Sequence, residues 1–358
     1  MDQVVPRFTL SRYRFTLEAQ EPLLAPALNK GNMLRGAFGA AFKRIACPSP
    51  NAPARALPNR ECHACDARDD CPYAAVFDTA PPAGADRLRL NTEIPRPFVV
   101  KPPLDATTYY DAGAPLVFDV VLVGRARRYL PFLLLAFEEI GTMGLGLRDE
   151  RGRRGRSRLV ATDAIVPGQP PVPVYDAATR TIRDVETTVT AAHLAASVRG
   201  GVADTSPYRP GASAAPTATE AVTSVRIGFL TPTAIKADGR MIDRPAFGHL
   251  LRRLRDRVNA LGTFYGDGPM DIDFRGLADR ADKVQMRECN VRWEDRARFS
   301  SHRLVEHDMS GFMGSAVYEG DLDEFVPLLA VSDWIHVGKN ATFGHGWTTT
   351  VTRRSRQL

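Results

Sequence analysis

Residues 120–146, VVLVGRARRYLPFLLLAFEEIGTMGLG, and residues 315–346, SAVYEGDLDEFVPLLAVSDWIHVGKNATFGHG, follow one pattern. Each contains an apolar strand-like run, a glycine, a proline seven residues later, an apolar helix-like run and a final Gly-x-Gly. Proline suits the first turn of a helix, because its missing N–H would have no partner there. The ordered correspondences predict two copies of one strand–turn–helix–loop unit. The matching pairs are Gly124 and Gly320, Pro131 and Pro327, Gly144 and Gly344, and Gly146 and Gly346.

The segments around these two copies predict an α+β fold. Apolar patterns place strands and helices in the order β-α-β-β-α-β twice, which is the ferredoxin-like plan. We therefore expect tandem ferredoxin-like domains over residues 1–166 and 223–358. Residues 167–222 are rich in Pro, Gly, Ala, Ser and Thr, and are interpreted as a linker or embellishment. The expected strands cover residues 7–19, 95–100, 116–123, 158–165, 224–230, 284–292, 312–319 and 346–352, and the helices cover residues 31–45, 128–140, 245–261, 274–281 and 322–331.

Composition and charge limit the classes of function. The 358 residues are 44% hydrophobic, and no stretch approaches the ~20 apolar residues of a membrane span. The N-terminus lacks a secretory signal pattern, so we expect a cytoplasmic protein without a membrane partner. The net charge of +6 modestly favours an anionic partner. Residues 148–158 carry six arginines beside one Asp and one Glu, which suits either a solvated loop or a nucleic-acid contact.

Four of the five cysteines fall within 25 residues, in the spacing C-x14-C-x2-C-x5-C. They are Cys47, Cys62, Cys65 and Cys71, in a cysteine-rich insertion over about residues 46–80. Four thiolates at such spacing are typical of a structural zinc site, which leaves no open position for chemistry. Reduced thiols are the alternative, and disulfides are disfavoured in the cytoplasm. The sequence therefore predicts one structural zinc.

The second copy ends in a glycine-rich loop, HVGKNATFGHGW, at residues 336–347. A phosphate-binding P-loop needs Gly five residues before its Gly-Lys pair and Ser or Thr directly after it. Asp333 and Asn340 occupy those places, so nucleotide binding by this motif is excluded. The remaining interpretations are that the loop closes a catalytic site or holds an RNA backbone.

Six stretches together resemble the CRISPR-associated RAMP endoribonucleases that process precursor CRISPR RNA. The resemblance implies two ferredoxin-like domains, a C-terminal glycine-rich loop that binds RNA, and a single cut in CRISPR repeat RNA without a metal or other cofactor. It implies repeat RNA and other CRISPR-associated proteins as partners. The stretches are KGNMLRGAFGAAFKRIAC (30–47), CPYAAVFD (71–78), PRPFVVKPP (95–103), AFEEIGTMGLG (136–146), DFRGLADRA (273–281) and HVGKNATFGHG (336–346).

Under this resemblance, glycines of the second loop let phosphates approach the backbone, and basic side chains contact phosphates. The expected RNA-binding residues are Gly338, Lys339, Gly344, His345, Gly346, Arg303, Arg153, Arg154 and Arg156.

The implied chemistry is attack of a ribose 2′-hydroxyl on the adjacent phosphate, which leaves a 2′,3′-cyclic phosphate on the upstream fragment. It needs a base, an acid and a cation near the developing charge. Some family members use a histidine near the first helix and others use Lys and Arg. This chain has no histidine before His63. The catalytic candidates are therefore Lys30, Arg35 and Lys43 near the first helix, with His302 as the rival.

Two other classes of function remain open at this point. A non-catalytic RAMP protein would bind mature crRNA as a structural subunit of an interference complex. A protein–protein adaptor stabilised by a structural zinc would explain the cysteines, but it would leave the duplicated glycine-rich loops without a role.

Overall fold

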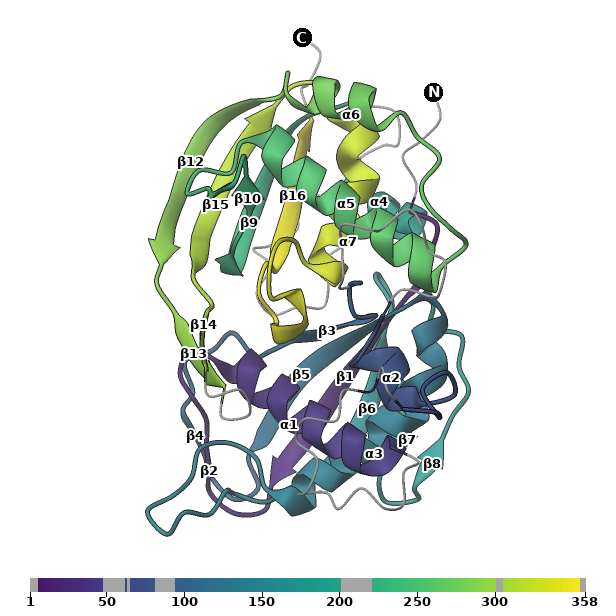
Figure 1. The fold of residues 1–358 in the computed structure, drawn as a ribbon, viewed down its shortest axis with the longest axis vertical. Coiled ribbons are helices and arrows are strands. Elements are labelled where there is room, and N and C mark those ends of the chain that lie inside the picture. The colour runs from purple at the N-terminus through teal and green to yellow at the C-terminus, as the bar shows by residue number, and fades with distance from the viewer. Residues whose placement is uncertain are drawn as a thin grey trace. The chain divides into compact units, whose positions relative to one another are not determined.

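The computed structural model describes residues 6–47, 62, 65–80, 94–200, 221–300 and 305–354 (Figure 1). The chain forms two compact units. The N-terminal unit comprises Tyr13–Ala164 and Val172–Glu186, and the C-terminal unit comprises Met1–Arg12, Ile165–Pro171 and Thr187–Leu358. No helix among the described residues is long and apolar enough to cross a membrane.

The N-terminal unit is a sheet with two helices across one face (Figure 1). Its strands follow the order β3-β5-β1-β6-β7-β8. The first four of these strands match the ferredoxin-like arrangement, because the first and third strands of the motif lie at its centre. The motif consists of β1 (Leu10–Ala19), α1 (Lys30–Ala46), β3 (Phe98–Lys101), β5 (Pro115–Val123), α3 (Leu130–Met143) and β6 (Ser157–Ile165), with the additions β2 (Leu23–Leu24), α2 (Pro72–Val76), β4 (Tyr109–Tyr110), η3 (Gly124–Tyr129), β7 (Val172–Asp176) and β8 (Thr181–Ile182).

An aromatic cluster holds these helices on the sheet. Helix α1 buries Leu34, Phe38 and Phe42, which are spaced four residues apart and so share one face. The ring of Phe38 stacks on Phe137 of α3 at 5.0 Å and meets Phe98 of β3 edge-on at 5.4 Å. Such aromatic pairs stabilise a fold by about 0.5–1.5 kcal/mol beyond the area that they bury.

The C-terminal unit repeats the same arrangement. Its sheet has the order β12-β15-β9-β16, with every pairing antiparallel. Phe247 of α5 contacts Tyr318 and Phe325, so the helical layer packs on the central strand β15. The elements are α4 (Ala191–Arg199), β9 (Val222–Thr233), β10 (Lys236–Ala237), β11 (Arg240–Met241), α5 (Phe247–Tyr265), α6 (Phe274–Ala281), β12 (Gln285–Glu294), β13 (Ala297–Ser300), β14 (Val305–Asp308), β15 (Gly311–Glu319), η4 (Asp323–Phe325), α7 (Val326–Ile335), η5 (Ala341–Phe343) and β16 (Thr348–Arg354).

The beginning of the chain also belongs to this C-terminal unit. The backbone N–H of Asp267, just after α5, donates to the carbonyl of Arg7 at 2.9 Å. A side chain at Gly266 would overlap that same carbonyl. Leu10, the first residue of β1, forms a bridge with Val189. The chain therefore passes from one unit to the other within β1.

The structure confirms the predicted duplication and the α+β, ferredoxin-like class. Both repeated prolines lie in the first turn of their helices, α3 and α7. All six repeated glycines have a positive φ, a conformation that favours glycine. The φ angles are 53° and 152° for Gly124 and Gly320, 77° and 85° for Gly144 and Gly344, and 94° and 70° for Gly146 and Gly346.

Residues 167–222 contain more structure than a linker would. Strands β7 and β8 extend the N-terminal sheet, and α4 belongs to the C-terminal unit, where Arg199 donates to the carbonyl of Asp323 at 3.0 Å. Residues 201–220 lie outside the described part of the chain. The segment is thus an embellishment where it is described, and its high Ala, Pro and Gly content concealed two short strands and a helix.

We expect Gly346→Ala to destabilise the protein more than Gly113→Ala. Both glycines have a positive φ, which costs an alanine about 1–2 kcal/mol. A methyl group at Gly346 would also overlap the Val337 carbonyl, whereas one at Gly113 meets no atom within 4 Å. Overlap of this kind costs about 1–3 kcal/mol more. Thermal unfolding of both variants measures the difference, and equal losses would show that the close approach at Gly346 is unimportant.

Candidate functional site

The glycine-rich loop, residues 336–347, is closed on itself and fastened to the end of β9. The Thr231 hydroxyl donates to the Gly344 carbonyl at 2.8 Å and accepts the Trp347 N–H at 2.9 Å. The Gly346 N–H donates to the Pro232 carbonyl at 3.0 Å. The Val337 N–H donates to the Gly346 carbonyl at 2.9 Å, which joins the two ends of the loop. The loop is therefore an ordered platform on the sheet.

Two of its glycines are needed by the chain itself. A Cβ at Gly338 would crowd the Ala234 carbonyl, and one at Gly346 would crowd the Val337 carbonyl. These contacts explain glycine at both positions without any ligand. Approach of RNA phosphates to Gly338, Gly344 and Gly346 stays a prediction.

His336 occupies a conformation that is almost restricted to glycine, with φ 61° and ψ 166°. Its side chain is fully buried and stacks on the Trp347 ring at 5.7 Å, and the Trp347 indole N–H donates to Asp333 at 2.7 Å. The His336 Nδ1 lies 3.0 Å from the His345 carbonyl, which can only accept, so Nδ1 carries the proton. His336 is thus a positioning residue at the base of the loop. Sequence reasoning missed this role, because backbone strain leaves no mark in the sequence.

His345 is buried, and burial together with nearby Arg296 lowers its pKa to about 4. It is therefore neutral at physiological pH and cannot attract a phosphate by charge. RNA contact by His345 stays a prediction, limited to hydrogen bonding or stacking. Lys339, in contrast, is exposed, and its charge contributes, after hydrogen bonds from Ser310, to the lowered pKa of Asp308. Phosphate contact by Lys339 stays a prediction.

Lys30 is buried at the start of α1, where its ammonium donates to Asp105. The Nζ atom lies 2.6 Å from the Asp105 carbonyl oxygen and 2.8 Å from a carboxylate oxygen. Burial opposes ionisation of Asp105, but hydrogen bonds from Lys30 and Thr107 together outweigh it, and the pKa of this carboxyl is lowered. Lys30 is therefore positioned as an anchor of α1, and catalysis by Lys30 stays a prediction.

Arg35 and Lys43 are eight residues apart, about two helical turns, and both side chains contact aromatic rings on one side of α1. The Arg35 guanidinium lies 5.5 Å from the centre of the Phe77 ring, and the Lys43 ammonium lies 5.3 Å from the centre of the Tyr73 ring. The two rings are themselves stacked at 5.3 Å. Cation–π contacts of this kind orient cations without neutralising them. The structure thus brings both candidates onto one aromatic platform beside α2.

His302 and Arg303 lie outside the described residues, between β13 and β14. Catalysis by His302 and phosphate contact by Arg303 stay predictions.

Two of the four clustered cysteines lie at helix ends. Cys47 caps the C-terminus of α1, and Cys71 precedes α2 with its thiol 4.0 Å from the Ala46 carbonyl. Burial, followed by the charge of Asp78, raises the pKa of the Cys62 thiol to about 11. The described residues include all four cysteines, and they contain no group of three or more His, Cys, Asp or Glu side chains that could hold a metal. The arrangement does not fit a zinc site as it stands, and zinc stays a prediction.

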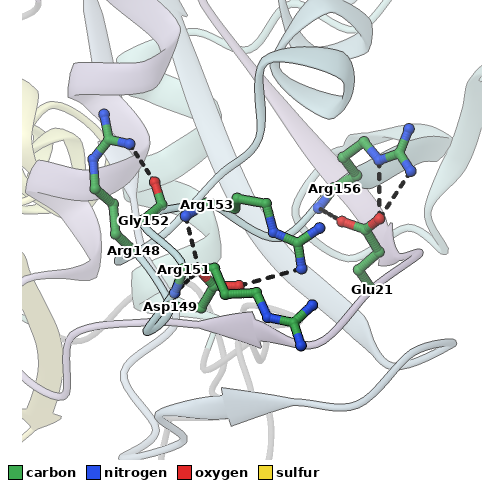
Figure 2. A network of polar contacts seen from close by, with 7 residues as sticks. All are labelled: Glu21, Arg148, Asp149, Arg151, Gly152, Arg153 and Arg156. Carbon is green, nitrogen blue, oxygen red and sulfur yellow. Dashed lines mark hydrogen bonds and ion pairs between the residues drawn. The ribbon is translucent and has the colours of Figure 1, made fainter.

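The three predicted phosphate contacts of the N-terminal unit lie in a loop after Gly146. Figure 2 shows two of them, Arg153 and Arg156. Arg153 lies 3.5 Å from the Asp149 carboxylate, and Arg154 Nε donates to the Gly146 carbonyl at 3.0 Å. Arg156 donates to Glu21 through Nε and Nη2, at 3.1 and 2.8 Å. These hydrogen bonds from Arg156 lower the pKa of Glu21. Arg156 is thus already neutralised by an acid.

Sequence models of known families match both units. The family model AF_1859_N, described as an N-terminal domain, matches residues 8–187. The model of the CRISPR-associated endoribonuclease Cas6 matches residues 227–348, which include the glycine-rich loop. Residues 227–348 therefore form a domain of the Cas6 family of CRISPR-associated endoribonucleases.

Solved Cas6 structures share the fold. Thermus thermophilus Cas6 is 14% identical, with a TM-score of 0.50, over 96% of this chain and 99% of that one. A product complex of the same Cas6 gives 15% identity and the same TM-score and coverage. A partial Cas6-RT-Cas1–Cas2 complex gives 11% identity and a TM-score of 0.54, over 99% of this chain and 48% of that one. No curated protein matches the sequence. At these identities the likeness shows the fold alone.

We expect the free energy of unfolding to fall as pH decreases from about 6.5 to about 4, in part because of His345. Across this range an unfolded histidine takes up a proton that folded His345 does not, so acid favours the unfolded state. The contribution is at most about 3 kcal/mol. Chemical unfolding of the wild type and His345→Gln at several pH values measures it. Equal slopes against pH in the two proteins would contradict the buried, neutral state of His345.

Proposed function

We propose that this chain cuts CRISPR repeat RNA once, by attack of a ribose 2′-hydroxyl on the adjacent phosphate. The products are an upstream fragment ending in a 2′,3′-cyclic phosphate and a downstream fragment with a free 5′-hydroxyl. The observation that carries the proposal is the match of the Cas6 endoribonuclease model to the C-terminal unit, including its glycine-rich loop. The nucleophile belongs to the RNA, so the reaction needs no metal-bound water.

The reaction requires a base for the 2′-hydroxyl, an acid for the 5′-oxygen and a cation for the charged phosphorane. Arg35 suits the last role, because a guanidinium stays charged and offers a fork of donors to phosphate oxygens. Lys43 and His302 are the candidates for proton transfer, since amines and imidazoles exchange protons readily when suitably placed. Lys30 is the least suited, because Asp105 already binds its ammonium.

One observation favours the alternative of a crRNA-binding subunit without activity. Helix α1 carries no histidine, and its first lysine is held in an ion pair with Asp105. A chain that kept the fold and the RNA contacts but lost the acid and base would have these features.

We expect purified protein to cut radiolabelled repeat RNA at one position in excess EDTA, and to leave a matched RNA with a 2′-deoxy at that position intact. Replacement of a residue that transfers a proton should reduce the single-turnover rate about 10²–10⁴-fold. The variants Lys30→Ala, Arg35→Ala, Lys43→Ala and His302→Ala are compared for this loss. Arg44→Ala is the matched control, because Arg44 is an exposed cation of α1 that pairs with Glu139 at 3.1 Å.

Tight binding of repeat RNA without a cut would contradict the enzyme proposal and favour the crRNA-binding subunit. Cleavage that needs a divalent ion, or that survives the 2′-deoxy substitution, would contradict the 2′-hydroxyl mechanism.

The proposed partners are the repeat RNA, as precursor and as mature crRNA, and other CRISPR-associated proteins. One of the similar structures is a Cas6-RT-Cas1–Cas2 complex, which supports the second kind of partner. This chain spans about half of that matched chain, so such an assembly is a proposal here. A cytoplasmic location stays a prediction.

We also propose that Cys47, Cys62, Cys65 and Cys71 bind one structural zinc after local rearrangement. Elemental analysis should find one zinc per wild-type chain, retained in Cys289→Ser and lost in a Cys62→Ser/Cys65→Ser variant. The double variant should unfold at a lower temperature, because a structural site contributes to folding. Wild-type protein free of metal would show that these residues are ordinary thiols.

A further inference from the structure

The two copies of the duplicated unit differ after their Gly-x-Gly. In the C-terminal copy, Trp347 alone separates Gly346 from β16. In the N-terminal copy, residues 147–156 separate Gly146 from β6. We call this added segment the arginine loop. It carries five arginines, so the N-terminal copy holds a concentration of positive charge where the C-terminal copy goes directly into its last strand.

The arginine loop is built as a tight turn around one carboxylate (Figure 2). One oxygen of Asp149 accepts the backbone N–H of Arg151 at 3.0 Å and that of Arg153 at 2.7 Å. The Asp149 N–H donates to the Arg153 carbonyl at 2.7 Å, and the Gly152 N–H donates to the Asp149 carbonyl at 2.9 Å. These bonds fix the backbone. Because the loop is already ordered, ligand binding costs it little conformational entropy.

Both ends of the arginine loop are attached to the segment after β1. The Leu147 N–H donates to the Leu24 carbonyl at 2.7 Å, and the Arg156 carbonyl accepts the Gln20 N–H at 2.9 Å. The Arg156 side chain donates two hydrogen bonds to Glu21. Arg156 therefore holds the loop in place, and its charge is compensated.

Three arginines of the loop keep uncompensated charges. Arg148 donates to the Gly152 carbonyl, and Arg154 donates to the Gly146 carbonyl, so both are oriented by neutral groups. The Arg151 side chain makes no hydrogen bond or ion pair with the described residues. All three side chains are exposed. Exposed arginines elsewhere commonly face an acid, as in the pairs Arg44–Glu139, Arg158–Glu18, Arg180–Glu138 and Arg287–Glu319.

We infer that Arg148, Arg151 and Arg154 bind phosphates of the RNA backbone, while Asp149, Arg153 and Arg156 position the loop that presents them. The inference rests on the proposed function, which supplies RNA as the anionic partner. A guanidinium fork matches the geometry of phosphate oxygens, and carbonyl anchoring directs the fork without cancelling its charge. The loop contributes affinity that is independent of base sequence, and it takes no part in the chemistry.

The test measures binding of repeat RNA that carries a 2′-deoxy at the cut site, by fluorescence anisotropy from 50 to 300 mM salt. Each phosphate contact contributes about 0.7–0.9 to the slope of log affinity against log salt. We expect the Arg148→Gln/Arg151→Gln/Arg154→Gln variant to bind at least ~10-fold more weakly at the lowest salt, with a slope smaller by about 2–3. The single variant Arg151→Gln should reduce the slope by about 0.7–0.9, and its side chain has no bonds whose loss could unfold the loop.

The matched control removes the same three charges elsewhere, in Arg125→Gln/Arg183→Gln/Arg275→Gln. These three side chains are also exposed and form no hydrogen bond or ion pair with the described residues. A lower affinity for RNA and a smaller salt dependence in the loop variants, but not in the control, support the inference. Wild-type binding and cutting, with loop variants that match the control, would overturn the inference and leave the proposed function intact. A wild type that neither binds nor cuts repeat RNA would remove the proposed function, and the RNA assignment of the loop with it.

Discussion

The close contact between Gly346 and the Val337 carbonyl is the constraint on which the glycine-rich loop depends. It lets the two ends of the loop form a backbone hydrogen bond, and that bond sets the entry of the chain into β16. In the N-terminal copy, Gly146 also lies against a backbone carbonyl, that of Leu24. A side chain at either position would overlap the carbonyl that it faces, so both loops require glycine there.

The two loops have diverged on this common frame. The C-terminal loop places its two histidines inside the protein, where His336 stacks on Trp347 and His345 stays neutral. The N-terminal loop has gained a turn whose arginines face solvent. One copy thus presents a nearly uncharged, rigid surface with Lys339 exposed, and the other presents a cluster of guanidinium groups.

Periodicity and spacing were enough to predict the strand and helix order of both units. Helix α6 covers the residues at which the sequence placed a short helix, and the structure shows that Asp273 caps its N-terminus. Helix α4 and strands β7 and β8 were missed, since α4 is rich in alanine and the two strands are only five and two residues long. At the site, the placement of Arg35 and Lys43 on one side of α1 followed from helix geometry. The burial of Lys30 against Asp105 and the strain at His336 depend on contacts between distant segments, which a single sequence does not display.

The attachment of the first residues to the C-terminal unit has a consequence for folding during synthesis. Arg7 contacts Asp267, about 260 residues later in the chain. At the usual elongation rate of about 5–20 residues per second, the first segment emerges roughly 10–50 s before its partner exists. The N-terminal sheet can form in that interval, but the start of β1 has to wait. In a nascent chain of this protein, the start of β1 therefore lacks its hydrogen-bond partners for most of translation. It forms its final contacts only when the second unit has been made.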